Sequence, residues 1–435
     1  MGWAKRAVLQ RGPRVKWISL LVLLALLAGL AAGALVRGWA PSLAGVAEVI
    51  EAFGGLWLNT LRMTVVPLVV SLIITGIASV ADAAKTGGLV GRAVLLFTVL
   101  IFTAAMFGIA GTEALLTLWP VDQGAAQAFV GGVGAGAVPI AEPPTFVTWL
   151  RGLAPANPVA AAANDNILQL VVFAVFFGFA ATQLPANLRG SIVDFFRAVS
   201  EAMIVVVRWI LLAGPIGVFG LSIGVGLRAG IGAAGTLAQY VAIVTAVTAG
   251  ATVLAWVIAV TWGRQPIGRF TAAAAPVWAI AASTQSSLAS LPAMLQAALG
   301  GLRIPPHVAD VTLPLAVAIF RFTSPVANLA VSFFIAHLYG LEPTLVQVAG
   351  AVVVAFAVSI ASVGLPGQVS FIASIAPICL ALGVPIDLLG ILIAVEVIPD
   401  IFRTLGNVTA DLAATSILAR REPREDVTRS EAGDV

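Results

Sequence analysis

Long stretches of apolar residues recur along almost the whole chain, and the polar segments between them are short. These stretches cover, approximately, residues 17–36, 55–80, 90–119, 157–184, 199–226, 237–262, 312–338 and 387–419. An α-helix rises about 1.5 Å per residue, so about 20 apolar residues span the hydrocarbon core of a bilayer, which is about 30 Å thick. The pattern therefore predicts an all-α integral membrane protein with eight transmembrane helices.

Two further apolar stretches, at about 271–300 and 345–386, are interrupted at their centres. The first carries a polar run at residues 283–287 (STQSS), and the second carries a glycine and proline break at residues 364–367 (GLPG). Lipid cannot hydrogen-bond to unpaired backbone groups, so a broken segment must lie inside protein or line a watery cavity. Because paired broken segments in transporters point to the binding site, we predict two re-entrant helical hairpins here.

Basic residues are unevenly distributed over the predicted loops. Residues 1–16 hold five basic residues and no acidic one. An even number of spans places both termini on one side. The loops of that side hold more basic residues than the opposite loops, namely Lys85, Arg92, Arg189, Arg197, Arg264, Arg269, Arg303, Arg420 and Arg421. Because basic loops stay in the cytoplasm, we expect both termini there, in a multi-pass protein of the plasma membrane (a bacterial inner membrane).

The composition limits the class of protein. Of the 435 residues, 60% are hydrophobic and 10% are charged, whereas a soluble domain carries about 25% charged residues. A soluble enzyme is therefore excluded, and membrane lipid is the expected environment. The formal net charge of +3 is small for a nucleic-acid-binding protein, so no nucleic-acid partner is expected. A single cysteine, Cys379, excludes a disulfide scaffold.

The last apolar stretch contains a stripe of polar and charged side chains. Its members follow one another at intervals of 4, 3, 4 and 4 residues, which places them on one helical face: Glu396, Asp400, Arg403, Asn407 and Asp411. An ionisable group inside a membrane costs about 2.5–3.5 kcal/mol, so such groups usually mark function. A structural ladder of ion pairs is the alternative, but it would not need two broken segments beside it.

This stripe has the chemistry to bind a zwitterion that bears an extra carboxylate. Asp400 can neutralise an ammonium group, and Arg403 can bind a carboxylate with two parallel hydrogen bonds. Helix N-termini at the hairpin tips can bind the second carboxylate through backbone N–H groups. Asp411 offers oxygen ligands to a small cation.

The sequence from about residue 58 to residue 421 resembles the dicarboxylate/amino-acid:cation symporters, which include the glutamate and aspartate transporters. The most specific part of the resemblance is residues 400–412 (DIFRTLGNVTADL). Supporting pieces lie, in the same order as in the family, at residues 63–68 (MTVVPL), 157–158 (NP), 286–287 (SS), 291–292 (LP), 313–315 (LPL) and 364–367 (GLPG). Several motifs in the right order carry more weight than any one of them.

The resemblance implies the glutamate-transporter-homologue fold. In that fold each protomer of a homotrimer has a static scaffold and a transport domain that moves as an elevator, with the second hairpin as the extracellular gate. The implied divisions are a basic cytoplasmic N-terminus (1–16), scaffold helices 1–2 (17–88), transport-domain helix 3 (89–119), an extracellular loop (120–156), scaffold helices 4–5 (157–235), the rest of the transport domain (236–421) and a cytoplasmic tail (422–435).

The resemblance also implies roles for individual residues. Asp400 would bind the substrate amino group and Arg403 its side-chain carboxylate. The other expected substrate-binding residues are Ser286, Ser287, Arg321, Ser324, Gly364, Pro366, Gly367, Thr404 and Asn407. The expected cation ligands are Asn407, Asp411, Ser359, Ile360 and Ser362. Because C4-dicarboxylate carriers of the family usually lack the acid at position 400, Asp400 favours aspartate or glutamate over succinate.

The seventh predicted span departs from the family pattern. The family has Asn-Met-Asp-Gly-Thr there, with the Asn and Asp as sodium ligands, whereas this chain has residues 320–324 (FRFTS). The third span has Phe97, Leu100 and Ile101 where sodium-binding members carry hydroxyl groups. We therefore expect fewer sodium sites than in the family, with sodium or a proton as the coupling ion and no other cofactor.

Arg321 in this motif has three interpretations. It replaces the arginine that the family often has in the first hairpin, where Gln285 stands, and pairs with Asp400 or Asp411. Alternatively it acts as a tethered cation in a lost sodium site. The structural alternative is that its long side chain extends toward a cytoplasmic crevice.

These features favour a secondary active transporter, a symporter of an acidic amino acid such as aspartate or glutamate with altered or reduced sodium coupling. The alternatives left open are a C4-dicarboxylate or other amino-acid symporter of the same fold, and an anion-conducting or uncoupled homologue. Residues 220–224 (GLSIG) match the G-x-S-x-G pattern of serine hydrolases. However, both histidines, His307 and His337, lie at predicted loop and span-end positions, and no enzymatic activity is expected.

Overall fold

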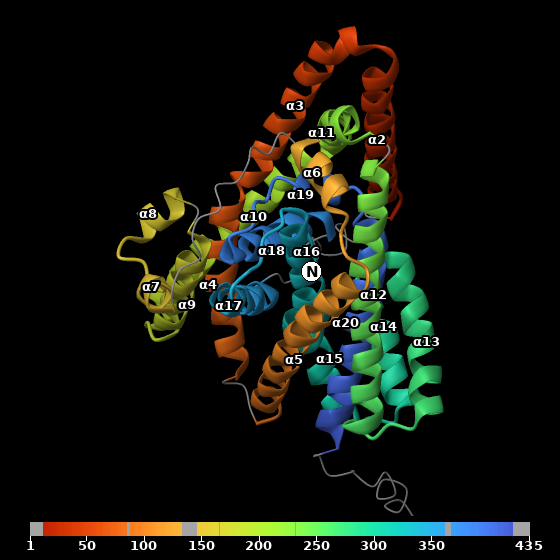
Figure 1. Ribbon diagram of the computed structural model, residues 1–435. Helices are drawn as coiled ribbons and strands as arrows, with labels where there is room; N and C mark the ends of the chain where they lie inside the picture. The colour runs from red at the N-terminus through yellow and green to blue at the C-terminus, as the bar shows by residue number, and fades with distance from the viewer. Residues whose placement is uncertain are drawn as a thin grey trace, which may run out of the picture.

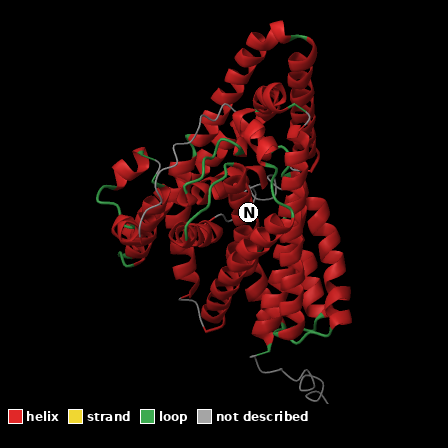
Figure 2. Cartoon of the chain, viewed as in Figure 1, coloured by secondary structure: helices red, strands yellow, loops and turns green. Residues whose placement is uncertain are grey.

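The structure, a computed structural model of the 435-residue chain, describes residues 12–84, 88–132, 146–164, 166–230, 232–361 and 367–420. Over these residues the chain forms helices joined by turns and has no β-strand (Figure 2). The α-helices of the first half are α2 (Gly12–Trp39), α3 (Ala44–Arg62), α4 (Val65–Ala84), α5 (Gly88–Leu118), α6 (Gln123–Gly132), α7 (Phe146–Gly152), α8 (Pro158–Ala163), α9 (Ile167–Thr182), α10 (Ala186–Leu212), α11 (Gly214–Ala229) and α12 (Gly232–Thr261). Those of the second half are α13 (Ile267–Thr284), α14 (Ser287–Gln296), α15 (Pro306–Ile319), α16 (Thr323–Leu338), α17 (Leu345–Ala361), α18 (Gly367–Leu382), α19 (Leu389–Leu392) and α20 (Val397–Ala419).

Fewer helices have the length and hydropathy of a membrane span than the eight that the sequence predicted. Within the described residues five helical segments qualify, and six if the bent pair α10–α11 counts as one span. The five are Leu20–Trp39, Pro41–Ala81, Gly88–Leu118, Gly232–Thr261 and Pro306–Leu338. α9 has only 16 residues, and α20 carries the charged stripe. The molecule is thus all-helical with several apolar helices, as a multi-pass membrane protein requires.

Prolines explain why three of the predicted spans are divided. A proline has no backbone N–H, so the carbonyl four residues before it loses its helical hydrogen bond. Pro67 follows the break between α3 and α4, Pro215 follows the 60° bend between α10 and α11, and Pro399 follows the turn at 393–396 between α19 and α20. The sequence therefore predicted the apolar segments correctly but missed these divisions.

Both stretches predicted as hairpins consist of two helices that pack against each other. In the first, α13 and α14 lie side by side (Figure 1), and a π-helical turn, Ala297–Gly301, follows them. Gln285 allows the reversal with a left-handed backbone, φ 51° and ψ 38°, and Ser286 caps α14 by accepting a hydrogen bond from the N–H of Ala289. In the second, α17 packs on α18, and residues 362–366 between them lie outside the described part.

The helices form two groups, and α20 is at the centre of one of them. α12, α13, α14, α15 and α16 all pack on α20, while α5 packs on α16 and α12. The other group contains α2 and α3 with α11, and α4 with α9 and α10. The groups meet where the second hairpin packs on α4 and α9 and where α19 packs on α11 (Figure 1). This arrangement puts the polar stripe of α20 inside a bundle rather than against lipid.

Residues 123–132, within the segment expected as an extracellular loop (120–156), are helical. They form α6, which packs on α11, α12 and α16. Asp122 caps this helix by accepting a hydrogen bond from the N–H of Ala125 at 2.7 Å, and Phe129 is fully buried. Gly132 permits the contact with α11, because a Cβ there would lie 2.6 Å from the Cα of Val225. The small residues of this helix allow it to pack closely on its neighbours.

The crossing of α3 and α11 depends on glycine, which leads to a stability prediction. A Cβ on Gly54 would lie 2.5 Å from the backbone nitrogen of Leu221, and one on Gly220 would lie 2.8 Å from the carbonyl oxygen of Ile50. Gly54→Ala is expected to lower the free energy of unfolding by about 1–3 kcal/mol through overpacking. The matched control is Gly55→Ala, since nothing lies within 4 Å of its Cβ position. Thermal unfolding in detergent checks this, and equal midpoints for both variants would contradict it.

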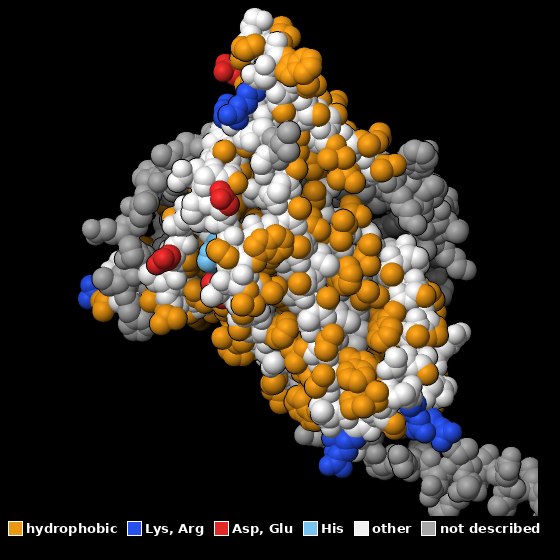
Figure 3. All heavy atoms as spheres, turned by 45° about the vertical axis from the view of Figure 1, so that its right-hand side comes forward, with side chains coloured by type: hydrophobic (Ala, Val, Ile, Leu, Met, Phe, Trp, Pro, Cys, Tyr) orange, Lys and Arg blue, Asp and Glu red, His pale blue; other side chains and the backbone are white. Residues whose placement is uncertain are grey.

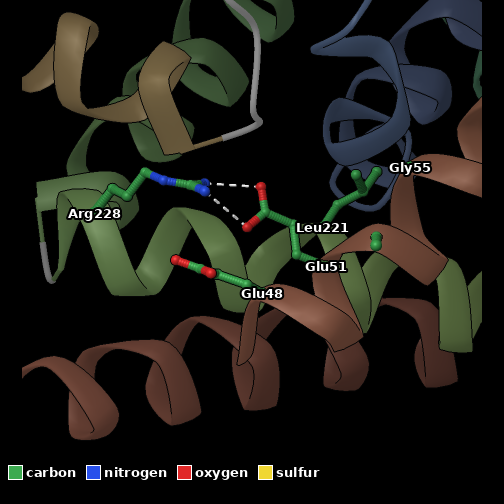
Figure 4. Close-up of a pocket in the computed structure, with 6 residues that line it drawn as sticks. Glu48, Glu51, Gly55, Leu221 and Arg228 are labelled. Atoms are coloured by element: carbon green, nitrogen blue, oxygen red, sulfur yellow. Dashed lines mark hydrogen bonds and ion pairs between the residues drawn. The ribbon is translucent and has the colours of Figure 1, made fainter. Parts of the chain in front are cut away.

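A shallow pocket of about 390 Å³ lies beside this crossing, between α3 and α11 (Figure 4). Arg228 of α11 donates two hydrogen bonds across it to the carboxylate of Glu51, at 2.8 and 2.9 Å, and a third to the carbonyl of Gly132. Glu48 lines the same pocket from one turn earlier on α3. The Arg228–Glu51 pair thus joins α3, α6 and α11, and the residues that line the pocket come from α3 and α11.

The surface agrees with a lipid environment. On the face shown in Figure 3, apolar side chains cover the middle of the molecule, and lysine and arginine side chains gather toward its two ends. Many large apolar side chains are exposed, among them Leu24, Phe53, Leu95, Phe176 and Trp209. A soluble monomer rarely exposes so much contiguous apolar surface.

Candidate functional site

The site is built around an unwound segment between α15 and α16. Phe320 ends α15 with an extended backbone, φ −109° and ψ 93°, and helical structure resumes at Thr323. The N–H of Ser324 bonds to the carbonyl of Arg321 at 3.0 Å, which forms a tight turn within the break. Interrupted helices inside a transporter leave backbone groups and helix ends available to a ligand.

Asn407 of α20 connects this break to the stripe. Its side-chain oxygen accepts hydrogen bonds from the backbone N–H and the hydroxyl of Thr323, both at 2.9 Å. The same hydroxyl lies 2.6 Å from the carbonyl oxygen of Arg403. The amide oxygen of Asn407 is thus directed at the start of α16, and its NH₂ group is the end suited to a substrate.

Arg403 is held in a buried network that reaches α12. Its Nη2 donates to Oε1 of Glu396 at 2.6 Å, and the hydroxyl of Tyr240 donates to Oε2 of the same carboxylate at 2.8 Å. Glu396 and Arg403 are 4% and 5% exposed. Nε of Arg403 is buried and has no hydrogen-bond partner among the described residues. Glu396 lies in the turn just before α20 rather than within a continuous helix.

Tyr240 is a site residue that sequence reasoning missed. It lies in α12, 156 positions before Glu396 in the chain, and it is completely buried against the ring of Phe334. The chain has only two tyrosines, and the hydroxyl of a buried tyrosine normally has a partner. A tyrosine within an otherwise apolar helix could therefore have indicated a buried hydrogen bond, but nothing in the sequence identified Glu396 as its partner.

The two aspartates of α20 differ in their surroundings. Asp400 is half-buried in the first turn, and the charges of Arg403 and Arg321 both act on it. Asp411 is completely buried, and neither carboxylate oxygen has a hydrogen-bond partner within the described part of the chain. The charge of Arg321 acts on Asp411 as well. The side chain of Arg321 is therefore electrostatically linked to both aspartates with which the sequence hypothesis paired it.

Aromatic rings fill the space beside the break. Phe97 of α5 stacks on Phe320 with ring centroids 4.5 Å apart and an interplanar angle of 11°, and Phe322 lies 6.0 Å from Phe320. All three rings are at most 2% exposed. These are the positions where the family pattern has oxygen ligands, so this part of the site is apolar and offers no side-chain oxygen to a cation.

The first hairpin tip reaches the start of α20. Nε2 of Gln285 lies 3.5 Å from the carbonyl oxygen of Val397, and Trp278 donates to the hydroxyl of Thr409 at 2.9 Å. Ser286 is engaged as the cap of α14, and Ser287 is half-buried in the first turn of that helix. The hairpin thus places a helix N-terminus, where backbone N–H groups can bind an anion, beside Gln285, which contacts the start of α20.

The remaining predicted residues occupy less direct positions. The hydroxyl of Ser324 accepts a hydrogen bond from Asn328 at 3.2 Å, and that of Thr404 donates to the carbonyl of Asp400 at 3.0 Å. The Ser359 hydroxyl is bonded within α17 to Ala355, so Ser359 and Ile360 could bind a cation only through backbone carbonyls of the last turn. Gly367 begins α18, and the predicted residues that lie outside the described part are Ser362, Gly364 and Pro366.

Comparison with known proteins identifies the family. The sodium:dicarboxylate symporter family matches this chain over residues 18–421. The chain belongs to this family. The resemblance noted in the sequence is therefore confirmed.

Three relatives show the range of substrates within this family. The chain is 27% identical over 401 residues to the proton/glutamate-aspartate symporter of Escherichia coli (strain K12), covering 88% of this chain and 87% of the relative. It is 28% identical over 467 aligned positions to the human neutral amino acid transporter B(0), covering 98% and 84%. It is 25% identical over 412 residues to the proton/sodium-glutamate symport protein of Bacillus caldotenax, covering 92% and 93%.

These relatives are transporters, so the expectation that this chain is not an enzyme is confirmed. The serine of the G-x-S-x-G match has a structural role. Ser222 is completely buried in α11 and donates a hydrogen bond to the carbonyl of Val218 at 2.7 Å. A Cβ on Gly29 of α2 would clash with its hydroxyl, so this pattern serves the packing of two helices.

Proposed function

We propose that this symporter carries an acidic amino acid, aspartate or glutamate, across the plasma membrane. In this proposal it works as a homotrimer with both termini in the cytoplasm. The group of helices around α20 moves as the transport domain, and the group around α4 and α11 stays in place. Lipid surrounds the apolar faces of both groups.

The observation that supports this proposal most is the pairing of opposite charges at the start of α20. Asp400 and Arg403 are three residues apart, so their side chains lie on one face. The tip of the first hairpin is adjacent, through the contact of Gln285 with Val397. Asp400 suits the substrate ammonium group, Arg403 its side-chain carboxylate, and the N-terminus of α14 its α-carboxylate.

We further propose that sodium coupling is weaker than in sodium-driven members of the family. The stacked rings of Phe97 and Phe320 replace oxygen ligands with hydrocarbon. The guanidinium of Arg321 supplies a fixed positive charge to Asp400 and Asp411. With Glu396 and Arg403 counted as well, three carboxylates face two guanidinium groups, so one net negative charge remains for a coupling cation or proton. Asp411 and the carbonyls of Ser359, Ile360 and Ser362 are where a remaining sodium ion would bind.

A specific observation supports a second candidate, a symporter of a neutral amino acid. The bond from Arg403 to Glu396 already satisfies part of the guanidinium. If that bond persisted in the loaded state, the site would accept an amino group at Asp400 but no side-chain carboxylate. A neutral amino acid transporter is among the relatives of this chain.

Reconstitution into liposomes tests these proposals. Radiolabelled aspartate, glutamate, succinate and alanine are offered under separate sodium and proton gradients. We expect saturable uptake of aspartate or glutamate that continues in sodium-free buffer. Uptake of succinate without amino acids would contradict the assigned role of Asp400, uptake of alanine alone would establish the second candidate, and strict sodium dependence would contradict the coupling proposal. Unsaturable anion currents without concentrative uptake would identify an uncoupled homologue.

A further inference from the structure

Arg403 has a resident partner, which poses a problem for substrate binding. Within the described residues it bonds to one carboxylate, that of Glu396, at 2.6 Å, and both side chains are almost completely buried. If a substrate carboxylate also bound to Arg403, two negative groups would share one guanidinium away from water. Like charges this close do not remain ionised together in a buried site.

The geometry allows a simple resolution of this conflict. Only one N–H of Arg403 is committed to Glu396, and its buried Nε has no partner among the described residues. The other oxygen of Glu396 is bonded to the hydroxyl of Tyr240, a group that can also accept a hydrogen bond. A protonated Glu396 can therefore stay bonded to Tyr240 after Arg403 leaves, and it is not left unsatisfied in the protein interior.

We propose that Glu396 is the proton-carrying residue of this symporter and that Arg403 changes partners during transport. This inference rests on the proposed function. A proton from the outer solution binds to the Glu396 carboxylate, the ion pair with Arg403 breaks, and the guanidinium binds the carboxylate of the substrate. On the inner side the substrate leaves, the proton passes to water, and Arg403 returns to Glu396. One proton therefore accompanies each acidic substrate, and the site keeps the same net charge when empty and when loaded.

The neighbouring groups favour Glu396 over other candidates for this role. The groups that act on it are Tyr240 of α12, and Arg403 and Asp400 of α20, while the charge of Cys379 of α18 acts on Tyr240. Asp400 is needed in its charged form to neutralise the substrate ammonium group. Cys379 donates a hydrogen bond to Ser332 at 3.3 Å instead. Glu396 is thus the carboxylate whose charge becomes superfluous when the substrate binds.

The experiment compares aspartate binding and proton movement in reconstituted wild-type protein and in Glu396→Gln. For wild type we expect aspartate to bind at least about tenfold more tightly at pH 6 than at pH 8, because uptake of one proton changes affinity by up to about tenfold per pH unit. We also expect aspartate uptake to acidify the vesicle interior, as reported by an enclosed pH-sensitive dye. In Glu396→Gln the ratio of the two dissociation constants should fall to about one and the acidification should disappear. Because the two dissociation constants are compared within one variant, a substitution that weakens aspartate binding equally at both pH values leaves their ratio unchanged.

The matched control is Glu113→Gln. Glu113 of α5 is another carboxylate with a hydrogen-bond partner, since its Oε1 lies 3.2 Å from Nε2 of His337. It is 41% exposed and pairs with His337 of α16 rather than with a residue of α20, so this variant should keep the wild-type pH ratio and the acidification. Tyr240→Phe removes the second hydrogen bond to Glu396. This variant should bind aspartate with a smaller ratio between the two dissociation constants, which tests the hydrogen-bond network independently of Glu396→Gln.

Two outcomes would overturn the inference. Wild-type acidification and an unchanged pH ratio in Glu396→Gln would show that the proton is carried elsewhere. Aspartate uptake by wild type without any acidification would show that Arg403 keeps its partner, although the proposed function would stand. If wild type neither binds nor carries aspartate or glutamate at either pH, the proposed function itself has failed, and the inference fails with it.

Discussion

Asp400→Asn is expected to abolish uptake of aspartate and glutamate while leaving binding of succinate intact. Asn has the shape of Asp but cannot neutralise an ammonium group, and a hydrogen bond to a charged group contributes about 1.5–3 kcal/mol. The amino acids should therefore bind about 10- to 150-fold more weakly. Succinate has two carboxylates and no amino group, so it does not need the charge at position 400. The measurement is the ligand-induced shift in melting temperature at several concentrations of each compound.

The control for this prediction is Asp194→Asn on α10, where an exposed aspartate pairs with Arg197 at 3.1 Å. It removes one carboxylate charge outside the stripe of α20 and should change the binding of neither aspartate nor succinate. If Asp400→Asn weakened the binding of succinate and of aspartate equally, Asp400 would stabilise the fold of the site rather than bind the amino group.

The sequence predicted best the helices that are uniformly apolar. α5 and α12 were expected at 90–119 and 237–262, and the structure has them at Gly88–Leu118 and Gly232–Thr261. In such segments the requirement to bury backbone groups in lipid leaves the helix as the only solution. Breaks next to Pro67, Pro215 and Pro399 were missed, because a proline in a membrane helix can cause either a mild kink or a full interruption. Which one occurs depends on the neighbouring helices.

The candidate site divides in the same way into local and distant features. The spacing of Asp400, Arg403 and Asn407 on one face follows from helix geometry alone, and the structure places them together. The pairing of Glu396 with Tyr240 joins positions 156 residues apart, and no local pattern contains it. Likewise, the sequence showed that oxygen ligands are missing at positions 320 and 97, but only the fold shows that the two rings stack on each other.

Arg403→Ala is expected to remove transport of acidic amino acids and to destabilise the protein. Loss of the guanidinium removes the binding partner of the substrate carboxylate, and we expect affinity for aspartate to fall at least about 100-fold, as bonds between a charged pair in a buried site imply. It also leaves Glu396 without its partner, and at a pH high enough to keep that buried carboxylate ionised the loss costs about 3–5 kcal/mol. A lower melting temperature should therefore accompany the loss of aspartate binding.

The double variant Arg403→Ala/Glu396→Gln separates these two effects. With a neutral side chain at 396 the uncompensated charge is gone, so the melting temperature should recover most of the loss, whereas aspartate affinity should stay low. Alanine should bind to both variants as well as to wild type, since Asp400 and the hairpin N-terminus remain to hold the amino group and the α-carboxylate. A double variant as unstable as Arg403→Ala would show that the guanidinium stabilises the fold by packing rather than through Glu396. Retained aspartate binding in either variant would remove Arg403 from the substrate site. Arg321, whose charge acts on Asp400 and Asp411, would then become the residue to test for the substrate carboxylate.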